Sequence, residues 1–481
     1  MIFSKKIRTI CLFTLFLFYP LTFFYSSTKD ARRVKDIKNN VFANQELLNP
    51  IFNKLYNLEK SKKGKINIVH IGDSHIQADF FTNAIRSELQ SKFGNGGYGF
   101  TFPYSLVRTN GTRNVRYSSN ASWQSLRNVL PITDVGVGLS GIALYTSSND
   151  FVLQLYTEEG YEFTNVKVIY PDKESHYKMS ISADPLEVTG AAPTSSTSGT
   201  SIKYHKVKKG ETLSSISRKY RVTVAQVRKA NGMKSNTIQL NQSLKIPTKA
   251  TTKPVQVKSK ETNLDTENLK FVNMLSKPYY SSYTSDSAIN RITLVPDGKT
   301  AMYNLNGFVI ENNQPGVVYH TIGVNGAKMT DYIKYPLFFK QLPILEPDLI
   351  ILSFGTNESF GKMSDTEYVF QLNEFINNIK AYCKNATILV MTPPPSMFRK
   401  GRQNTFVADY SVALMGLNYL PVWDLYSRMS GDSAIRPRGD YASMIARDKV
   451  HYTTGGYEAQ GQLFISDFLD AYNNYKNKYD K

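Results

Sequence analysis

The sequence has little cysteine, because Cys11 and Cys383 are the only two among 481 residues. Cys11 lies in an apolar run near the N-terminus and lacks the small preceding residues that mark a bacterial lipid-modified cysteine. Without that run a single cysteine remains, which excludes an internal disulfide and leaves packing to stabilise the fold. Cys383 comes late in a predicted helix, where we expect a small buried hydrophobic residue rather than a nucleophile.

Acidic residues are also scarce, with 39 against 58 lysines and arginines, which gives a net charge of +19. A basic surface points to a polyanion such as nucleic acid, acidic lipid or an anionic wall polymer. The composition is 41% hydrophobic and 12% aromatic, which excludes a disordered protein. At this length the chain can form two or three packed domains.

Long apolar runs are absent except for Ile10–Tyr25, which Pro20 interrupts. Three positive charges precede it, at Lys5, Lys6 and Arg8. This pattern predicts that residues 1–27 are an export signal peptide or an N-terminal anchor. No Ala-x-Ala cleavage site is evident, which leaves an uncleaved anchor open. An exported protein of the periplasm or cell envelope would not meet nucleic acid, and it would touch a membrane only through this segment.

An apolar strand followed at once by a tight turn and a helix makes Ser74 the first candidate for chemistry. Ile66–Ile71 predicts a buried strand, Gly72–His75 the turn, and helical spacing of apolar residues continues to Phe93. Such a turn raises a serine above the sheet edge, where the helix N-terminus offers unpaired N–H groups to an oxyanion. The alternative is that Ser74 merely caps the helix, as serine often does.

Strands and helices alternate again from Val317 onward. The strand signals end near Gly323, Phe354 and Met391, and polar turns follow them. This alternation predicts a parallel sheet with helices on both faces, whose sites form at the carboxyl ends of the strands. Gly326 and Asn357, like Ser74, come just after such an end.

Six histidines offer bases for a serine nucleophile, and His451 is the best placed. Asp448, three residues earlier in the same loop, can orient its ring, as acyl transfer by serine requires. His75 adjoins Ser74, but neighbouring side chains on a turn generally diverge. An Asp-x-x-His pair is also common in plain surface loops, so this pair alone leaves both interpretations open.

Between these two α/β parts the spacing of apolar residues becomes alternating. Residues 136–200 and 262–315 contain short segments typical of an antiparallel sandwich. Linkers rich in Ser, Thr and Gly, or in Lys and Thr, separate them from residues 203–248. We therefore predict one α/β domain from residues 45–135 and 316–476, interrupted by a β-sandwich-like domain that itself carries a small module.

The small module resembles a LysM domain. The matching stretches are Tyr204–Val207, Lys209–Leu213, Val222–Val224, Ala230–Gly232 and Ile238–Pro247. The resemblance implies a βααβ fold that binds glycans containing N-acetylglucosamine, in bacteria usually peptidoglycan. The alternative is a basic helical hairpin that serves only as a spacer.

Together, the polar stretches after the strands resemble the four sequence blocks of SGNH (GDSL-like) hydrolases. They are Gly72–Ser74, Gly326 after Val324-Asn325, Gly355–Asn357 and Asp448–His451, in that order. The resemblance implies a flavodoxin-like three-layer α/β/α fold, with no metal and no cofactor. It implies Ser74 as nucleophile, His451 as base and Asp448 as the residue that orients the base. The oxyanion hole would comprise the N–H groups of Ser74 and Gly326 and the side-chain amide of Asn357.

Two positions depart from these blocks, since His75 replaces the common leucine and Glu358 replaces the usual aspartate. Ala78–Thr82, Phe93-Gly94 and Gly97–Gly99 further resemble the opening of bacterial peptidoglycan O-acetylesterases of the SGNH family. Those enzymes carry a carbohydrate-binding-like β domain between the first and second blocks, as this chain does. The LysM-like module nested inside it departs from that pattern.

We therefore expect a serine esterase that removes O-acetyl groups from peptidoglycan through an acyl-serine intermediate. A separate glycan-binding module would raise the local concentration of the polymer at the active site. One alternative is a deacetylase of another polysaccharide, such as xylan or exopolysaccharide, and another is a peptidoglycan-binding scaffold without turnover. A third is a metal hydrolase built on Asp73, His75 and Asp79, whose spacing fits no common ligand pattern.

Overall fold

The computed structural model describes residues 42–181, 200–249 and 269–480, apart from residues 209, 210, 221, 223, 234, 236, 434, 436–438 and 440. The predicted signal or anchor, residues 1–27, and most of the two predicted linkers lie outside the described residues. The chain forms two compact units, one from the described residues before 182 and after 268, the other from residues 200–249. Among the described helices, none is both long and apolar enough to cross a membrane.

The first unit is built on a six-stranded sheet in the order β1-β23-β20-β19-β2-β18. Its parallel strands are β2 (Lys65–Gly72), β18 (Gly316–Gly323), β19 (Leu349–Ser353), β20 (Thr387–Met391) and β23 (Val422–Trp423). At one edge, β1 (Phe42–Ala43) pairs antiparallel with β23. Gly72 at the end of β2 lies opposite both Gly323 and Ser353, so three strands end beside the turn that holds Ser74.

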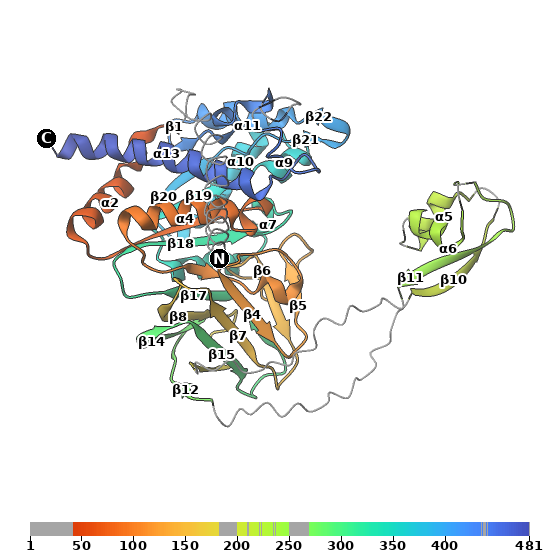
Figure 1. Cartoon of the computed structure of the whole chain (residues 1–481), viewed down its shortest axis with the longest axis horizontal. Helices are drawn as coiled ribbons and strands as arrows, with labels where there is room; N and C mark the ends of the chain where they lie inside the picture. The colour runs from red at the N-terminus through yellow and green to blue at the C-terminus, as the bar shows by residue number, and fades with distance from the viewer. Residues whose placement is uncertain are drawn as a thin grey trace, which may run out of the picture. The chain divides into compact units, whose positions relative to one another are not determined.

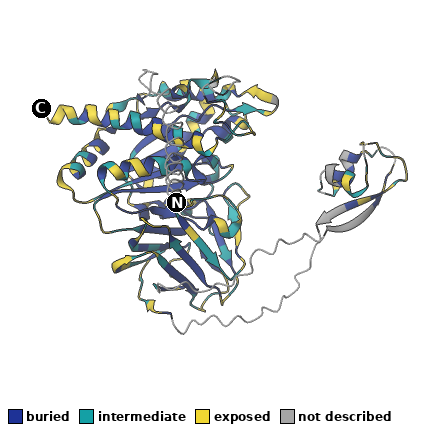
Figure 2. Ribbon diagram, viewed as in Figure 1, coloured by how far each residue is buried: buried dark blue, intermediate teal, exposed yellow. Residues whose placement is uncertain are grey.

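Helices cover both faces of this sheet (Figure 1). Because successive side chains of a strand point to opposite faces, β2 contributes Ile66 and Ile68 to one core and Val69 and Ile71 to another. The first core includes α2 (Asn49–Ser61), α4 (Phe80–Phe93) and α13 (Thr454–Tyr479). The second includes α7 (Met329–Ile333), α8 (Pro336–Gln341), α10 (Asp365–Tyr382) and α11 (Thr405–Met415). The predicted three-layer α/β/α fold is confirmed, and its strands are largely buried (Figure 2).

Local sequence signals explain several of these elements. α10 begins where the Ser364 hydroxyl accepts a hydrogen bond from the Glu367 N–H at 3.2 Å, as an N-cap serine does. After this helix, Cys383 is buried, and burial raises the pKa of its thiol to about 11.

The remaining short elements are η2 (Gln45–Leu48), α3 (Ser74–Gln77), η3 (Tyr104–Val107), η5 (Leu342–Leu345), α9 (Thr356–Phe360), β21 (Met397–Phe398), η6 (Arg399–Gly401), β22 (Arg402–Gln403), α12 (Leu425–Arg428) and η7 (Gly431–Ser433).

The antiparallel pair β21-β22 and three larger antiparallel sheets complete the first unit, and the larger sheets have the orders β12-β9-β15-β7-β4, β13-β14-β8-β17-β3 and β16-β6-β5. Their strands are β3 (Gly99–Thr101), β4 (Val115–Ser119), β5 (Gln124–Arg127), β6 (Ile142–Thr146), β7 (Leu153–Thr157), β8 (Phe163–Ile169), β9 (Tyr177–Ser180), β12 (Phe271–Val272), β13 (Leu275–Lys277), β14 (Tyr280–Ile289), β15 (Arg291–Pro296), β16 (Tyr303–Leu305) and β17 (Gly307–Glu311). Phe151, Tyr177 and Tyr303 contact one another by their rings inside this region. They belong to the same hydrophobic cluster as one face of the parallel sheet, so the two parts share a core.

The antiparallel sheets begin earlier than residue 136, the boundary that we expected. β3 pairs with β17, β4 with β7 and β5 with β6, and all three of these early strands precede that residue. β4 and β5 are edge strands of their sheets and contain few buried residues. The apolar alternation that identifies a half-buried strand is therefore weak in them.

The second unit has the order β10 (Thr200–Lys206), α5 (Leu213–Lys219), α6 (Val224–Ala230) and β11 (Ser243–Lys249). The two strands pair antiparallel, with Thr200 opposite Lys249. Its small core consists of Val207, Leu213, Ile216, Val227, Leu244 and Ile246. The predicted βααβ module is confirmed.

Candidate active site

The turn after β2 holds Ser74 as the first residue of α3. A side chain at Gly72 would not fit, because an added Cβ would lie 2.6 Å from the Ser353 carbonyl oxygen. Asp73 caps the helix, since its Oδ1 accepts a hydrogen bond from the His75 N–H at 2.9 Å. The cap is therefore Asp73, and the Ser74 hydroxyl remains for another contact.

That contact is His451. Ser74 Oγ lies 2.8 Å from His451 Nε2, although 377 positions separate the two residues. Nδ1 of the same ring lies 2.7 Å from Asp448 Oδ2. Asp448 Oδ1 in turn accepts the N–H groups of Val450 and His451, each at 3.0 Å. The structure thus brings Ser74, His451 and Asp448 into one hydrogen-bonded chain.

The charge on Asp448 determines which atoms of this chain carry protons. Burial by itself raises the pKa of Asp448, but the hydrogen bonds from the His451 ring and from two backbone N–H groups lower it to about 2. At neutral pH Asp448 can therefore only accept a hydrogen bond, so His451 Nδ1 carries a proton. Nε2 of the neutral ring then accepts from the Ser74 hydroxyl, which is the arrangement in which an imidazole can remove the proton of a serine.

Gly326 and Asn357 follow β18 and β19, the strands on either side of β2. Asn357 Nδ2 donates to the Ala327 carbonyl at 2.9 Å and to Asp73 Oδ2 at 3.2 Å, so it lies between the residues that adjoin Gly326 and Ser74. Gly326 has φ +84°, a conformation that favours glycine. Within the described part of the chain, the amides of Ser74 and Gly326 donate to no protein acceptor.

Two buried carboxyl groups adjoin these residues. Burial and, to a smaller extent, the nearby Glu358 together raise the pKa of Asp73 to about 8, against the lowering effect of the hydrogen bond from the His75 N–H. Burial also raises the pKa of Glu358 to about 7. The Glu358 oxygens accept the N–H groups of Met329 and Gly355 at 3.0 Å each. Glu358, the departure from the usual sequence block, therefore holds the start of α7 against the start of α9.

His75 does not diverge from the site as expected, because its ring lies beside that of His451, with centroids 5.4 Å apart. Its Nδ1 lies 3.0 Å from the Tyr457 hydroxyl of α13, and its Nε2 is buried without a hydrogen-bond partner among the described residues. Burial, with a smaller contribution from the nearby His451, lowers the pKa of His75 to about 3. His75 is therefore neutral and packs behind the candidate base.

The other four histidines are engaged elsewhere. His70 contacts Ser353 Oγ at 2.6 Å, His320 accepts the Phe100 N–H at 3.0 Å, His176 lies 3.5 Å from Asp297, and His205 lies 2.7 Å from Glu211. Burial lowers the pKa of His70 to about 3 and that of His320 well below its usual value. These contacts leave His451 as the histidine that is hydrogen-bonded to Ser74.

Asp79 does not share a site with Asp73 and His75. Its carboxylate accepts the guanidinium of the fully buried Arg86 through two hydrogen bonds, of 2.9 and 3.0 Å, together with the hydroxyls of Thr82 and Tyr98. The guanidinium takes the place that a metal cation would need. No group of three or more His, Cys, Asp or Glu side chains that could hold a metal occurs among the described residues.

A polar network that the sequence did not indicate borders the site. Gln77 Oε1 accepts the Asn325 N–H at 2.7 Å, and Gln77 Nε2 donates to Thr109 Oγ1 at 2.9 Å and to the Asn110 carbonyl at 2.7 Å. These bonds fix the turn before Gly326 against α3. The residues come from three distant stretches, so no spacing in the sequence could reveal them.

Comparisons with known proteins bear on both units. Residues 303–459, which include Gly326, Asn357, Asp448 and His451, match the GDSL-like lipase/acylhydrolase family. Residues 205–247 match the LysM domain family. Both family resemblances predicted from the sequence are thereby confirmed.

Among solved structures, a peptidoglycan O-acetylesterase aligns with 88% of this chain and 96% of its own, with TM-score 0.60 and 18% identity. This likeness shows a shared fold over most of the chain. A lipase/acylhydrolase from Enterococcus faecalis aligns with 33% of this chain and 77% of its own, with TM-score 0.26 and 23% identity. The curated protein named probable N-acetylmuramoyl-L-alanine amidase AmiB, from Haemophilus influenzae, is 40% identical over 73 residues, 15% of this chain. The match spans 17% of that relative's length.

Proposed function

We propose that this chain, which carries a GDSL-like acylhydrolase domain and a LysM domain, is a serine esterase that removes O-acetyl groups from peptidoglycan. The observation that carries the proposal is the Ser74–His451–Asp448 chain of hydrogen bonds, with separations of 2.8 and 2.7 Å. The LysM domain and the fold shared with a peptidoglycan O-acetylesterase support the choice of substrate. The net charge of +19 suits a polymer whose stem peptides carry carboxylates.

In the proposed reaction, Ser74 Oγ attacks the acetyl carbonyl carbon while His451 Nε2 takes the hydroxyl proton. Asp448 stays ionised and stabilises the imidazolium. When the tetrahedral intermediate collapses, His451 gives the proton to the departing sugar oxygen, and the acetyl group remains on Ser74. A water molecule then attacks the acetyl carbon as His451 removes its proton, which releases acetate and restores the serine.

We assign the oxyanion hole to the N–H groups of Ser74 and Gly326 and to the side-chain amide of Asn357. These groups would donate to the carbonyl oxygen as it gains negative charge, and such donors contribute most when they are held in place beforehand. The two hydrogen bonds that now hold the Asn357 amide differ in length, 2.9 Å to Ala327 and 3.2 Å to Asp73. We infer that the longer one, to Asp73, is exchanged for the oxyanion.

We also propose that the protein acts at the cell envelope or in the periplasm, where peptidoglycan lies. The charged and apolar pattern of residues 1–27, which lie outside the described residues, supports export. Within the predicted domain division, we move the first boundary from residue 136 to the start of β3 at Gly99.

Acetate release from purified O-acetylated peptidoglycan tests the proposal. The wild-type protein should release acetate, and Ser74→Ala should lower the rate of release by at least about a thousand-fold. Acetylated xylan, tested in parallel, separates peptidoglycan from other polysaccharides, and mass spectrometry of the muropeptides identifies the sugar that loses its acetyl group. Undiminished release by Ser74→Ala would overturn the proposal.

A further inference from the structure

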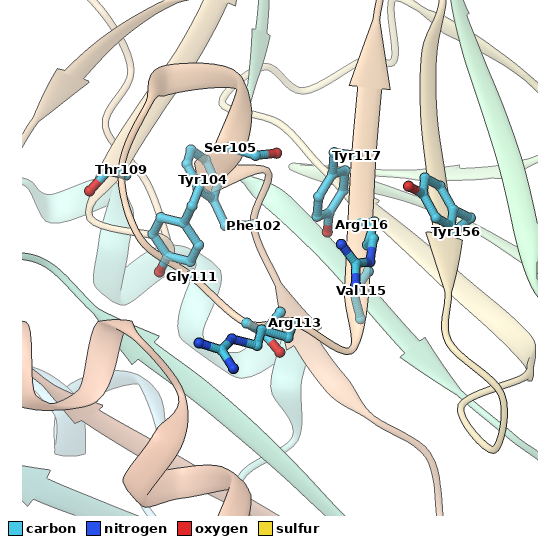
Figure 3. Close-up of a pocket in the computed structure, with 11 residues that line it drawn as sticks. Phe102, Tyr104, Ser105, Thr109, Gly111, Arg113, Val115, Arg116, Tyr117 and Tyr156 are labelled. Atoms are coloured by element: carbon cyan, nitrogen blue, oxygen red, sulfur yellow. The ribbon is translucent and has the colours of Figure 1, made fainter. Parts of the chain in front are cut away.

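A cavity of about 300 Å³ opens between η3, the loop that follows it and strands β4 and β7. Figure 3 shows the rings of Tyr104, Tyr117 and Tyr156 and the guanidinium groups of Arg113 and Arg116 around it. Its volume is at the lower end of the range for small-molecule sites, and aromatic walls with a few polar groups are typical of such sites. The reaction proposed above gives this cavity no role.

The cavity carries a positive charge that the chain does not neutralise. Arg116 Nε lies 2.5 Å from Glu158 Oε1 in an exposed ion pair. Arg113, by contrast, has no carboxylate partner in the ranges that the structure describes, and its guanidinium lies over the Phe80 ring, 5.0 Å from the centroid. A guanidinium held over a ring and lacking an acidic partner suits a carboxylate, which it can bind through two parallel hydrogen bonds.

One set of contacts joins the cavity to the oxyanion residues. Thr109, in the cavity wall, accepts hydrogen bonds from Gln77 Nε2 at 2.9 Å and from Asn325 Nδ2 at 3.2 Å. Gln77 ends the short helix that begins at Ser74, and Asn325 immediately precedes Gly326. The wall of the cavity therefore adjoins the residues that flank the proposed oxyanion hole.

A second set of contacts joins Arg113 to the candidate base. The Phe80 ring beneath Arg113 stacks on Tyr457 with centroids 6.5 Å apart. The Tyr457 hydroxyl is bonded to His75, whose ring lies beside His451. Arg113 is therefore connected to the candidate base through Phe80, Tyr457 and His75.

We propose that the cavity binds a carboxylate on the lactyl-peptide substituent of the muramic unit whose acetyl ester lies at Ser74. The carboxylate pairs with Arg113, and the carbon chain that bears it packs against Tyr104 and Tyr117. This assignment rests on the proposed function and adds a specificity to it, namely a preference for muramic units over neutral sugar units. Two sources supply the carboxylate: the lactyl group of a peptide-free unit and the stem peptide of a peptide-bearing unit.

Competitive inhibition of p-nitrophenyl acetate hydrolysis by the full-length protein tests the assignment, because an inhibitor of this small ester must bind beside Ser74. Muramyl dipeptide should inhibit, and Arg113→Gln should raise its inhibition constant about ten-fold, as loss of a charged hydrogen bond predicts. Arg113→Lys, which keeps the charge, should raise the inhibition constant by a smaller factor. Lys178→Gln, which removes an exposed charge from β9 outside the cavity, is the matched control.

Two further arms make the result specific. Glu158→Gln frees Arg116 and should lower the inhibition constant of muramyl dipeptide roughly two- to five-fold, the range for exposed ion pairs. Inhibition by N-acetylglucosamine, which lacks a carboxylate, should be the same with and without Arg113. If inhibition by N-acetylmuramic acid also weakens in Arg113→Gln, the lactyl carboxylate is the ligand. If only inhibition by muramyl dipeptide weakens, the stem peptide supplies the carboxylate.

Direct binding separates failure of this assignment from failure of the proposed function. Muramyl dipeptide is titrated into full-length Ser74→Ala with and without Arg113→Gln. Arg113-dependent binding to a protein that proves to have no esterase activity would keep the cavity assignment and contradict the proposed function. An active esterase for which Arg113→Gln changes neither the inhibition nor the binding of the two acidic ligands would overturn the cavity assignment.

Discussion

At the scale of single residues, Asp448 determines how the candidate site is protonated. Its side chain is 52% exposed, and yet three hydrogen bonds lower its pKa to about 2 against the effect of burial. It is therefore ionised at every pH at which the protein is expected to work. Because solvent screens such an exposed pair, the pair contributes more to orientation of the ring than to stability.

Asp448→Asn should lower kcat/KM for acetate release by roughly a hundred-fold or more, because the amide no longer holds His451 in the tautomer that accepts from Ser74. Initial rates on O-acetylated peptidoglycan measure the effect. Asp297→Asn, which changes the partner of His176 at 3.5 Å, is the matched control and should behave as wild type. A wild-type rate for Asp448→Asn would contradict the assigned role.

Asp73 should make the folded protein less stable as the pH rises. Its pKa is about 8 in the folded chain against an ordinary value of 3.8, so the unfolded chain releases this proton first. Folding therefore binds a proton between these values, and the free energy of unfolding decreases from about pH 4 to about pH 8. Asp73→Asn removes this titration, so its Tm relative to wild type should increase between pH 5 and pH 8.

Thermal unfolding of the wild-type protein and of Asp73→Asn at several pH values between 5 and 8 measures this difference in Tm. Glu358, whose pKa is raised to about 7, titrates in the same direction and remains in the variant, so part of the slope persists. A Tm difference between the two proteins that stays constant from pH 5 to pH 8 would show that Asp73 does not titrate in this range.

The residues of the site differed in how well the sequence could predict them. His451 and Asp448 are three positions apart and joined by local hydrogen bonds, so their spacing carried the signal. The position of His75 depends instead on Tyr457, which is 382 positions away, and no local pattern encodes that contact. A rule that adjacent side chains diverge failed there because α13 supplies the surface on which His75 packs.

At the scale of elements, a buried ion pair joins α4 to the turn before it. Arg86 is fully buried between the Tyr98 ring, 4.3 Å from its guanidinium carbon, and the carboxylate of Asp79. Asp79 itself precedes α4 with φ +61°, a conformation that Asp and Asn tolerate better than most residues. The pair therefore fixes α4, which packs with α2 and α13 on one face of the parallel sheet.

Arg86→Met should cost about 3–5 kcal/mol in the free energy of unfolding, because it leaves the Asp79 carboxylate buried without its partner. Urea unfolding measures the loss. The double variant Asp79→Asn with Arg86→Met removes the stranded charge and should recover part of it. A single variant within about 1 kcal/mol of wild type would mean that water reaches Asp79 and solvates it.

The elements that the sequence predicted well are those buried on both faces. The apolar runs of β2, β19 and β20 identified them as strands of a parallel sheet. The boundary near residue 136 failed because β4 and β5 are edge strands with mostly exposed or half-buried side chains. Their place in the antiparallel sheets depends on pairing with β7 and β6, which comes later in the chain.

At the scale of the whole molecule, the LysM unit is inserted between two strands of the first unit that already lie side by side. Phe271 of β12 pairs with Ser180 of β9, so the chain leaves and returns at neighbouring strands. Excision of residues 186–268, with a short Gly/Ser joint, should therefore leave the first unit folded. The hydrogen-bonded chain of Ser74, His451 and Asp448 lies entirely within that unit.

The excised protein should release acetate from insoluble peptidoglycan at least about ten-fold more slowly than the full chain, because a linked binding module raises the effective concentration of the polymer. Hydrolysis of p-nitrophenyl acetate, a soluble ester, should not change. Rates on the two substrates at equal enzyme concentration measure the difference. Equal loss on both substrates would indicate damage to the first unit, and no loss on either would exclude a role for the LysM unit.

The central claim is that Ser74 is a nucleophile activated by His451. Labelling with an organophosphonate, followed by peptide mass spectrometry, tests it most directly, because the reagent traps an activated serine. The wild-type protein should carry one adduct, located on Ser74, and His451→Ala should label at least about a hundred-fold more slowly. An unlabelled wild-type protein, or an adduct on a residue other than Ser74, would contradict the claim.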